Sequence, residues 1–172
     1  MPEQIYNDYQ CSSNELRTWE IPSARLIDTS PTVSNPAVVN GRRYANGEAI
    51  GGAIIALGTS PGGTAFAEID FGTGNVYFWY VRNVLTYDGQ HAEASWGAIN
   101  IGDPVYYDDS ATMPAGVYLS TSPLDDYGNT NVKFGHVVGC NVDDMEDYAK
   151  GGGTASTQRC GVMIMGASPG TT

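Results

Sequence analysis

Positive charge is the scarcest feature of this 172-residue chain. It has 8 Lys and Arg residues against 19 Asp and Glu, which gives a formal net charge of −11 at pH 7. Proteins that bind nucleic acid or anionic membranes contact phosphates through clustered Lys and Arg side chains. The sequence contains no such cluster, so we expect neither nucleic acid nor a membrane surface as a partner.

Long apolar runs are also missing, and we expect no secretory leader. The longest apolar runs, Ala53–Leu57 and Val76–Val81, are far too short to cross a bilayer. The segment Met1–Asp8 has neither the basic nor the apolar region of a signal peptide.

Cysteine is rare, with 3 residues in the chain: Cys11, Cys140 and Cys160. An odd count fits reduced thiols better than a disulfide framework. Cys140 and Cys160 both lie in strand-like segments, so the fold can bring them close together. We expect buried, reduced thiols and synthesis in a cytoplasm.

Groups for catalysis are few, because the chain has only 2 histidines. His136 alternates with apolar residues and is predicted to be a hydrogen-bonded core residue, whereas His91 follows a turn and is predicted to be on the surface. Neither belongs to a nucleophile–base constellation or a zinc motif. Gly72–Gly74 lacks the third glycine and the helix of a dinucleotide site, and Gly151–Thr154 lacks the lysine of a phosphate loop. We therefore expect no enzyme and no cofactor.

One acidic loop, Asp125–Asn131, has oxygen ligands at a spacing that suits Ca²⁺. It lacks a glutamate at the twelfth loop position, where His136 stands instead. A solvated turn without a metal is the favoured interpretation, and a calcium site is the alternative.

What the sequence has in abundance is turns, with 22 Gly and 9 Pro. Short apolar or alternating segments between these turns predict about ten strands, and hence an all-β domain folded as a compact β-barrel or β-sandwich. The domain spans residues 24–172, with a Gly-rich acidic insertion at 141–157. The expected strands are 24–28, 37–39, 42–44, 49–57, 64–71, 76–84, 105–107, 117–119, 132–140 and 159–165.

Two of these strands carry special features. In Ala49–Leu57 the pair Gly51-Gly52 predicts a bulged or closely packed strand. Val76–Val84 is apolar on both faces, which predicts a strand in the centre of a sheet or at an interface. Before them, Asn40-Gly41 is a strong hairpin signal, with Arg42–Tyr44 as the returning strand.

Residues 1–23 form an N-terminal arm in this interpretation. They are either a mobile tail or an arm that packs on a neighbouring molecule, since a disordered tail seldom carries so many aromatic residues. The candidate interface residues are Tyr6, Tyr9 and Trp19 in the arm and Tyr77 and Trp79 in the long apolar strand.

The stretch Ser95–Asp109 organises the chain. An apolar approach ends at a Gly102-Asp103-Pro104 turn and is followed by β-forming residues. Gly102 is free to take a positive φ, while Pro104 fixes its own φ and extends Asp103. This predicts a framework corner that feeds a strand, built from Trp96, Gly102, Asp103, Pro104, Val105 and Tyr106.

The span Pro36–Met165 resembles a family of small bacteriophage capsid cement, or decoration, proteins. The residues that carry the likeness are Pro36–Gly41, Ile50–Leu57, Trp96–Asp108, Phe134–Val138 and Cys160–Met165. The arm and the insertion depart from the family pattern. Some family members carry a recombinase-like label, which the missing phosphate loop and basic patch argue against.

The resemblance implies a β-rich virion protein, often a trimer, that binds the major capsid protein on the outside of an icosahedral shell and stabilises it. Such a subunit is made in the host cytoplasm. The alternative is a carbohydrate- or receptor-binding β module on a virion or cell surface, for which exposed Trp79 or Trp96 beside acidic loops would be the signature.

Overall fold

Strands dominate the computed structural model, so the predicted all-β class is confirmed. The structure describes residues 18–28, 30–40, 49–72, 74–83, 86–87, 91–92, 99–110, 113–125, 127–140, 157–165 and 167–168. Within these ranges the only helical element is one 3-10 turn, η1 (Ser23–Arg25). The strands are β1 (Thr18–Pro22), β2 (Pro36–Asn40), β3 (Ala49–Thr59), β4 (Ala65–Asp70), β5 (Val76–Arg82), β6 (Thr86–Tyr87), β7 (His91–Ala92), β8 (Pro104–Tyr107), β9 (Leu119–Ser120), β10 (Val132–Cys140), β11 (Thr157–Ile164) and β12 (Ala167–Ser168).

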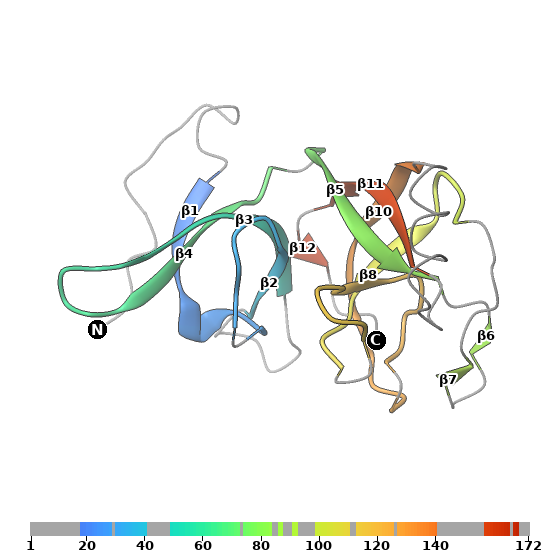
Figure 1. Ribbon diagram of the computed structural model, residues 1–172, viewed down its shortest axis with the longest axis horizontal. Coiled ribbons are helices and arrows are strands. Elements are labelled where there is room, and N and C mark those ends of the chain that lie inside the picture. The colour runs from blue at the N-terminus through green and yellow to red at the C-terminus, as the bar shows by residue number, and fades with distance from the viewer. Residues whose placement is uncertain are drawn as a thin grey trace.

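Strands β1, β2, β3, β4 and β12 form a five-stranded sheet. Its central strand is β3, whose Ala53 is paired with Pro36 of β2 and with Asp70 of β4. Strand β1 extends the sheet beyond β4, and Thr18 lies opposite Asp70. Figure 1 shows this sheet to the left of a second strand assembly. Its own apolar cluster contains Ile21, Leu26, Ala37, Val39, Ile54, Ala67 and Ile69.

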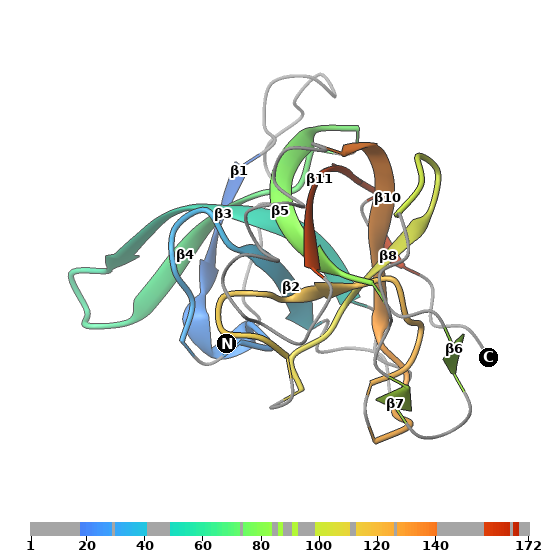
Figure 2. The same cartoon turned by 45° about the vertical axis from the view of Figure 1, so that its right-hand side comes forward.

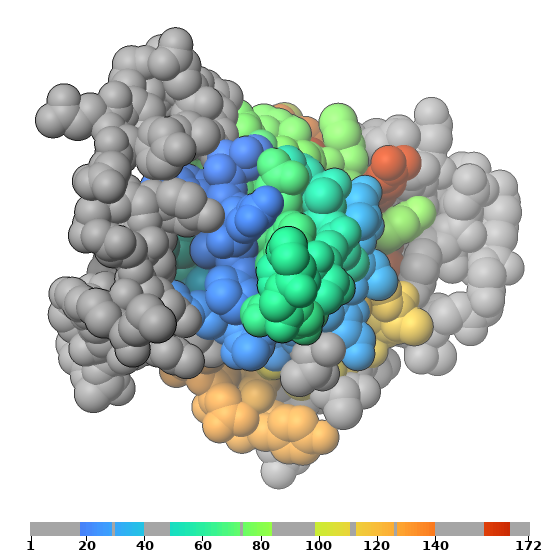
Figure 3. Space-filling view, turned by 90° about the vertical axis from the view of Figure 1, so that its left-hand side faces the viewer, coloured from blue at the N-terminus to red at the C-terminus, as the bar shows by residue number. Residues whose placement is uncertain are grey.

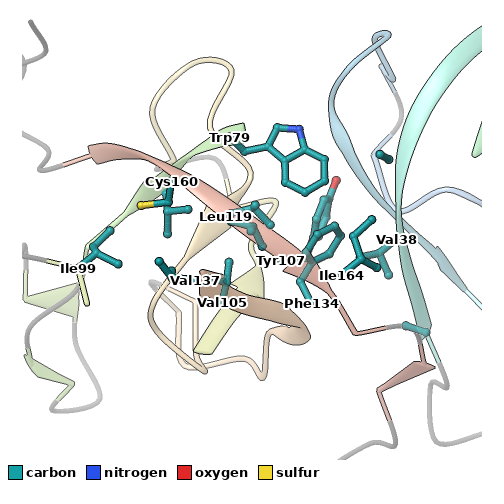
Figure 4. Close-up of a cluster of buried hydrophobic side chains, with 14 residues drawn as sticks. Val38, Trp79, Ile99, Val105, Tyr107, Leu119, Phe134, Val137, Cys160 and Ile164 are labelled. Carbon is teal, nitrogen blue, oxygen red and sulfur yellow. The ribbon is translucent and has the colours of Figure 1, made fainter. Parts of the chain in front are cut away.

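The second assembly is a closed barrel in the strand order β10, β11, β5, β9, β8. All its pairs are antiparallel except β5 and β9, where Val81 lies opposite Leu119 in a parallel register. Closure pairs both edges of each barrel strand and so removes exposed edges. The interior is filled by buried side chains (Figure 4), among them Trp79, Val81, Val105, Tyr107, Leu119, Phe134, Val137, Cys160, Val162 and Ile164.

Part of the sheet packs into the barrel's hydrophobic cluster where β3 approaches β10. Gly51 makes this approach possible, because a Cβ atom at its position would lie 2.7 Å from Cδ2 of Phe134. At Gly52 a Cβ atom would lie 2.5 Å from Cγ2 of Ile69. The predicted close packing of this glycine pair is therefore confirmed. The sheet residues buried in the barrel's cluster are Val38, Ala49 and Ala53.

The β3–β4 hairpin extends away from the barrel (Figures 1 and 2). Figure 3 shows it in green, next to β1 in blue. Phe66 covers the glycine opposite it, since a Cβ atom at Gly58 would lie 2.5 Å from the ring. Ile55 and Leu57 of this hairpin are among the exposed large apolar residues of the described chain.

Two sequence predictions in this region are wrong. Residues 24–28 do not form a strand: η1 takes the first two, and Leu26 makes only an isolated bridge to Val39. The arm does not continue to Ser23, because Thr18–Pro22 is strand β1 of the protein's own sheet. The apolar alternation of Trp19 and Ile21 spans too few residues to signal a strand in the sequence.

Three further predictions lie wholly or in part outside the described residues. Among the described residues, β2 pairs antiparallel with β3. The expected returning strand at Arg42–Tyr44, like residues 1–17 and 141–156, lies outside the described residues.

Candidate interaction surface

Strand β5 presents apolar side chains on both of its faces. Successive side chains of a strand point to opposite faces, and β5 follows this rule with Trp79 and Val81 buried in the barrel. The alternate residues point outward and are exposed by 46% at Val76, 60% at Phe78 and 41% at Tyr80. Three large apolar residues in a row thus face solvent on one strand.

The interface residues predicted on this strand were Tyr77 and Trp79; the structure places Trp79 in the barrel interior and Tyr77 partly buried against the same cluster. Trp79 is only 8% exposed, and its ring meets the Phe134 ring edge-on with centroids 5.4 Å apart. Its indole Nε1 donates a 2.7 Å hydrogen bond to the Ser34 carbonyl oxygen. Tyr77 stacks on Trp79 with centroids 5.1 Å apart and an interplanar angle of 18°. Both side chains therefore belong to the interior and its rim.

Tyr77 also fixes the corner between the sheet and the barrel. Its hydroxyl donates to the buried carboxylate of Asp70, which also accepts hydrogen bonds from the Gly72 amide and the Asn75 side chain, each at 2.8 Å. Burial, and then the hydrogen bond and charge of Asp70, raise the pKa of Tyr77 to about 12. The hydroxyl is thus held in its neutral, donating form, which suits a structural role.

Strands β11 and β10 follow β5 in the barrel order (Figure 2), and their outward residues continue the outward face of β5. In the β11 register, Met163 lies opposite Val76, Gly161 opposite Phe78 and Arg159 opposite Tyr80. The Arg159 guanidinium carbon is 5.9 Å from the centroid of the Phe78 ring, a cation–π contact of the kind that is worth about 0.5–1 kcal/mol at exposed sites. Val138 of β10 is also exposed, at the bulge next to Gly139, which lies opposite Gly161. We call the set Val76, Phe78, Tyr80, Val138, Arg159 and Met163 the outer barrel surface.

This outer barrel surface differs from the rest of the chain in charge. It contains one arginine and no acidic residue, although the chain as a whole has a net charge of −11. Gly161 lies at its centre, where a Cβ atom would come within 3.4 Å of Cγ1 of Val76 and 3.5 Å of Cε1 of Phe78. An apolar, aromatic centre with an arginine and few acidic groups is the composition of a protein–protein contact.

Sequence reasoning chose residues of β5 that lie on the inward side of the strand, because β5 is apolar on both faces and alternation alone does not say which face is outside. One residue indicated which face of β5 is outside: in the alternation, the charged Arg82 shares a face with Phe78 and Tyr80. In the structure, however, Arg82 is itself only 3% exposed and its Nη1 lies 3.7 Å from Sδ of Met113. The position of Arg82 in the sequence therefore indicates the outward face of β5, although Arg82 itself is buried.

The remaining candidate interface residues are not brought together. Trp19 is half-buried in β1, where it lies opposite Ile69 and packs against the sheet's own apolar cluster. Tyr6 and Tyr9 lie outside the described residues.

The predicted framework corner is present in the described part of its stretch. Gly102 has a φ of 97°, as expected, and its amide donates a 2.7 Å hydrogen bond to the carbonyl oxygen of Val137 in β10. The Val137 amide donates a 2.9 Å hydrogen bond to the carbonyl oxygen of Asp103. The Asp103 carboxylate in turn accepts a 2.7 Å hydrogen bond from the Asn100 amide. The corner thus attaches the start of β8 to β10. β8 contains Pro104, Val105 and Tyr106; Trp96 lies outside the described residues.

His136 is not the core residue that the alternation predicted. It is half-buried in β10, opposite Pro104 and Met163. Register shifts on both sides of it break the period of two, so Val137 rather than His136 turns into the barrel interior. For His91 the structure gives a place in β7, opposite Tyr87.

The Asp125 loop satisfies its carboxylate internally. Asp125 Oδ1 accepts hydrogen bonds from the amides of Tyr127 at 2.8 Å and Asn129 at 2.7 Å, and Oδ2 accepts one from Asn129 Nδ2 at 2.7 Å. Burial opposes ionisation, but the hydrogen bonds outweigh it and lower the pKa of Asp125. These contacts support the solvated turn. Nowhere in the described ranges do three or more His, Cys, Asp or Glu side chains gather so as to hold a metal ion.

A stacked tyrosine pair is the other titratable cluster. The rings of Tyr107 and Tyr118 lie 6.2 Å apart, and the Tyr107 hydroxyl is buried. Burial, then the charges of Asp28 and Asp109, raise the pKa of Tyr107 far above its usual value. Burial and Asp28 also raise the pKa of Tyr118. Both hydroxyls therefore stay protonated at neutral pH.

Comparison with models of known protein families, with curated proteins and with solved structures finds no match for this chain. In the described residues there is no helix long and apolar enough to cross a membrane.

Proposed function

We propose that this protein is a structural virion protein that binds the outside of an icosahedral bacteriophage capsid and stabilises it as a cement, or decoration, subunit. The observation that carries the proposal is the outer barrel surface. Phe78 is 60% exposed with Val76 and Tyr80 on either side, although the same strand already contributes Trp79 and Val81 to the core. Contiguous exposed apolar residues of this kind mark contacts with other proteins.

Sequence composition supports a structural role. The resemblance of Trp96–Asp108 and the other quoted segments to capsid cement proteins gives the class of partner, the major capsid protein. A subunit on the capsid exterior has no need of the Lys and Arg clusters that the chain lacks.

A cement protein acts by mass action. It binds the assembled shell and not the separated capsid subunits, so it stabilises the shell by about 2.7 kcal/mol per site when its free concentration is 100 times the dissociation constant. A stable contact of this type buries roughly 1,200–2,000 Å² in total. Three subunits around one axis, the trimer that the resemblance implies, would multiply the contact area of each shell-binding unit.

The test mixes the purified protein with undecorated shells assembled from the major capsid protein encoded in the same genome. We expect the protein to co-sediment with the shells and to raise the temperature at which they break open. Light scattering coupled to size exclusion gives the oligomeric state of the free protein in parallel. Failure to bind and failure to stabilise the shells would together refute the proposal.

The carbohydrate- or receptor-binding alternative called for an exposed Trp79 or Trp96, and the first of these is not exposed. Trp79 is buried, and the described part of the chain has no exposed tryptophan. A glycan array with the same purified protein separates the two functions, because a cement protein gives no specific signal there.

A further inference from the structure

Two of the three cysteines occupy facing positions on adjacent barrel strands. In the antiparallel pair of β10 and β11, Cys140 and Cys160 are direct Cα partners. They are also the last residue of β10 and the fourth residue of β11, so they flank the connection through residues 141–156. Cys160 is completely buried, with its Sγ atom 3.6 Å from the Gln158 carbonyl oxygen.

This register suits a covalent link. Direct partners in antiparallel strands have Cα atoms about 4.5–5.5 Å apart, and disulfides join Cα atoms about 4.4–6.8 Å apart. A bridge here would need no change in strand pairing. The register also favours closure within one chain, because the two Cα positions are already direct partners in the folded barrel.

We propose that Cys140 and Cys160 are a redox modification site, reduced after synthesis and joined by a disulfide when the protein meets a small-molecule disulfide such as oxidised glutathione. One cysteine thiolate attacks the oxidised glutathione, and a glutathione thiolate leaves. The second cysteine thiolate then attacks the protein sulfur of this mixed disulfide and releases another glutathione. Two protein thiols lose their protons and two electrons, and one glutathione disulfide is reduced to two thiols.

The bridge closes the base of the connection between β10 and β11. A disulfide stabilises chiefly by restricting the unfolded chain, and a loop of roughly 20 residues gives an effect that corresponds to a rise in Tm of about 6–13 °C in a chain of this size. The bridge also lies beside the outer barrel surface, since Gly161 follows Cys160 and lies opposite Phe78. It therefore fixes two of the three strands that carry this surface.

The experiment uses the full chain with Cys11→Ser, which removes the third thiol. The protein is incubated for hours with oxidised glutathione, because burial of Cys160 slows the reaction, and is then digested with trypsin without reductant. We expect residues 134–150 and 160–172 to be recovered as one disulfide-linked pair, since trypsin cleaves after Lys133, Lys150 and Arg159. Tm should rise by the amount above and return on reduction.

The matched control is Cys11→Ser combined with Cys140→Ser, which should show no Tm rise with oxidised glutathione. The tryptic map needs no second variant, so it decides the matter even if the control is poorly stable. Glutathione adducts without the linked peptide pair, disulfides between separate chains, or a bridge that forms only in denaturant would each overturn the proposal.

Discussion

Replacing Gly51 by alanine tests the contact through which the sheet packs on the barrel. The new Cβ atom would lie 2.7 and 2.9 Å from two ring carbons of Phe134, so the ring must retreat by roughly 0.8 Å to reach a normal carbon–carbon contact. Phe134 is completely buried and meets Trp79 edge-on, which leaves little room. Such overpacking costs about 1–3 kcal/mol, and the entropy gained by removing a strand glycine returns about 0.5–1 kcal/mol.

We therefore expect Gly51→Ala to lower the free energy of unfolding by about 1–2 kcal/mol, with a Tm lower by about 2–8 °C. The control is Gly139→Ala, because a Cβ atom at Gly139 meets nothing within 4 Å; it should be neutral or stabilising by up to about 1 kcal/mol. Urea unfolding followed by tryptophan fluorescence measures both.

Phe134→Leu supplies the third arm of the test. If the ring is the obstacle, Gly51→Ala should cost less in the Phe134→Leu background, with a coupling of at least about 0.5 kcal/mol. The reasoning is refuted if Gly51→Ala and Gly139→Ala have the same effect, or if the Gly51→Ala loss is unchanged when the ring is absent.

Two further predictions concern titratable groups. The folded-state pKa of Tyr77 is raised to about 12 from an unfolded value of about 10, so the stability that Tyr77 contributes is complete below pH 10 and is lost as the pH rises toward 12. In urea unfolding, Tyr77→Phe should cost about 1 kcal/mol at pH 7 and should lose less stability at high pH than the wild type. Identical high-pH profiles for the two proteins would contradict this role of Tyr77. Asp125→Ala should speed hydrogen exchange at the Tyr127 and Asn129 amides, which the Asp125 carboxylate protects in the wild type. This protection should be complete above the usual carboxyl pKa and should be lost only as the pH falls through the lowered pKa of Asp125. Unchanged exchange in the variant would show that the carboxylate does not hold the loop.

Local rules of chain geometry made part of the fold readable from the sequence. Gly102 and Pro104 have restricted or special φ values, so the corner before β8 followed from residue identity alone. The close packing at Gly51 was readable for a similar reason, since two glycines within an apolar strand indicate a close approach of another element. The partner, Phe134, was not readable, because no local rule specifies which distant strand arrives there.

The side to which each strand residue points and the register between strands were harder to predict from the sequence, and the candidate surface depends on both. Alternation places Trp79 and Phe78 on opposite faces but does not say which face is inside when both are apolar. In β10 the bulges beside His136 shift the period, so a strict alternation put His136 in the core in place of Val137. The end of the arm was missed because β1 gains its stability from pairing with β4 and not from its own sequence.

The proposed capsid role is tested most directly by shell binding of two matched surface variants. Phe78 and Tyr127 are exposed by 60% and 69%, so Phe78→Ser and Tyr127→Ser should both fold, but only the first alters the outer barrel surface. In co-sedimentation with undecorated shells, the wild type and Tyr127→Ser should bind equally, and Phe78→Ser should bind at least about tenfold more weakly, the size of effect found at central interface residues. Equal binding by all three proteins, or binding by none, would contradict the account.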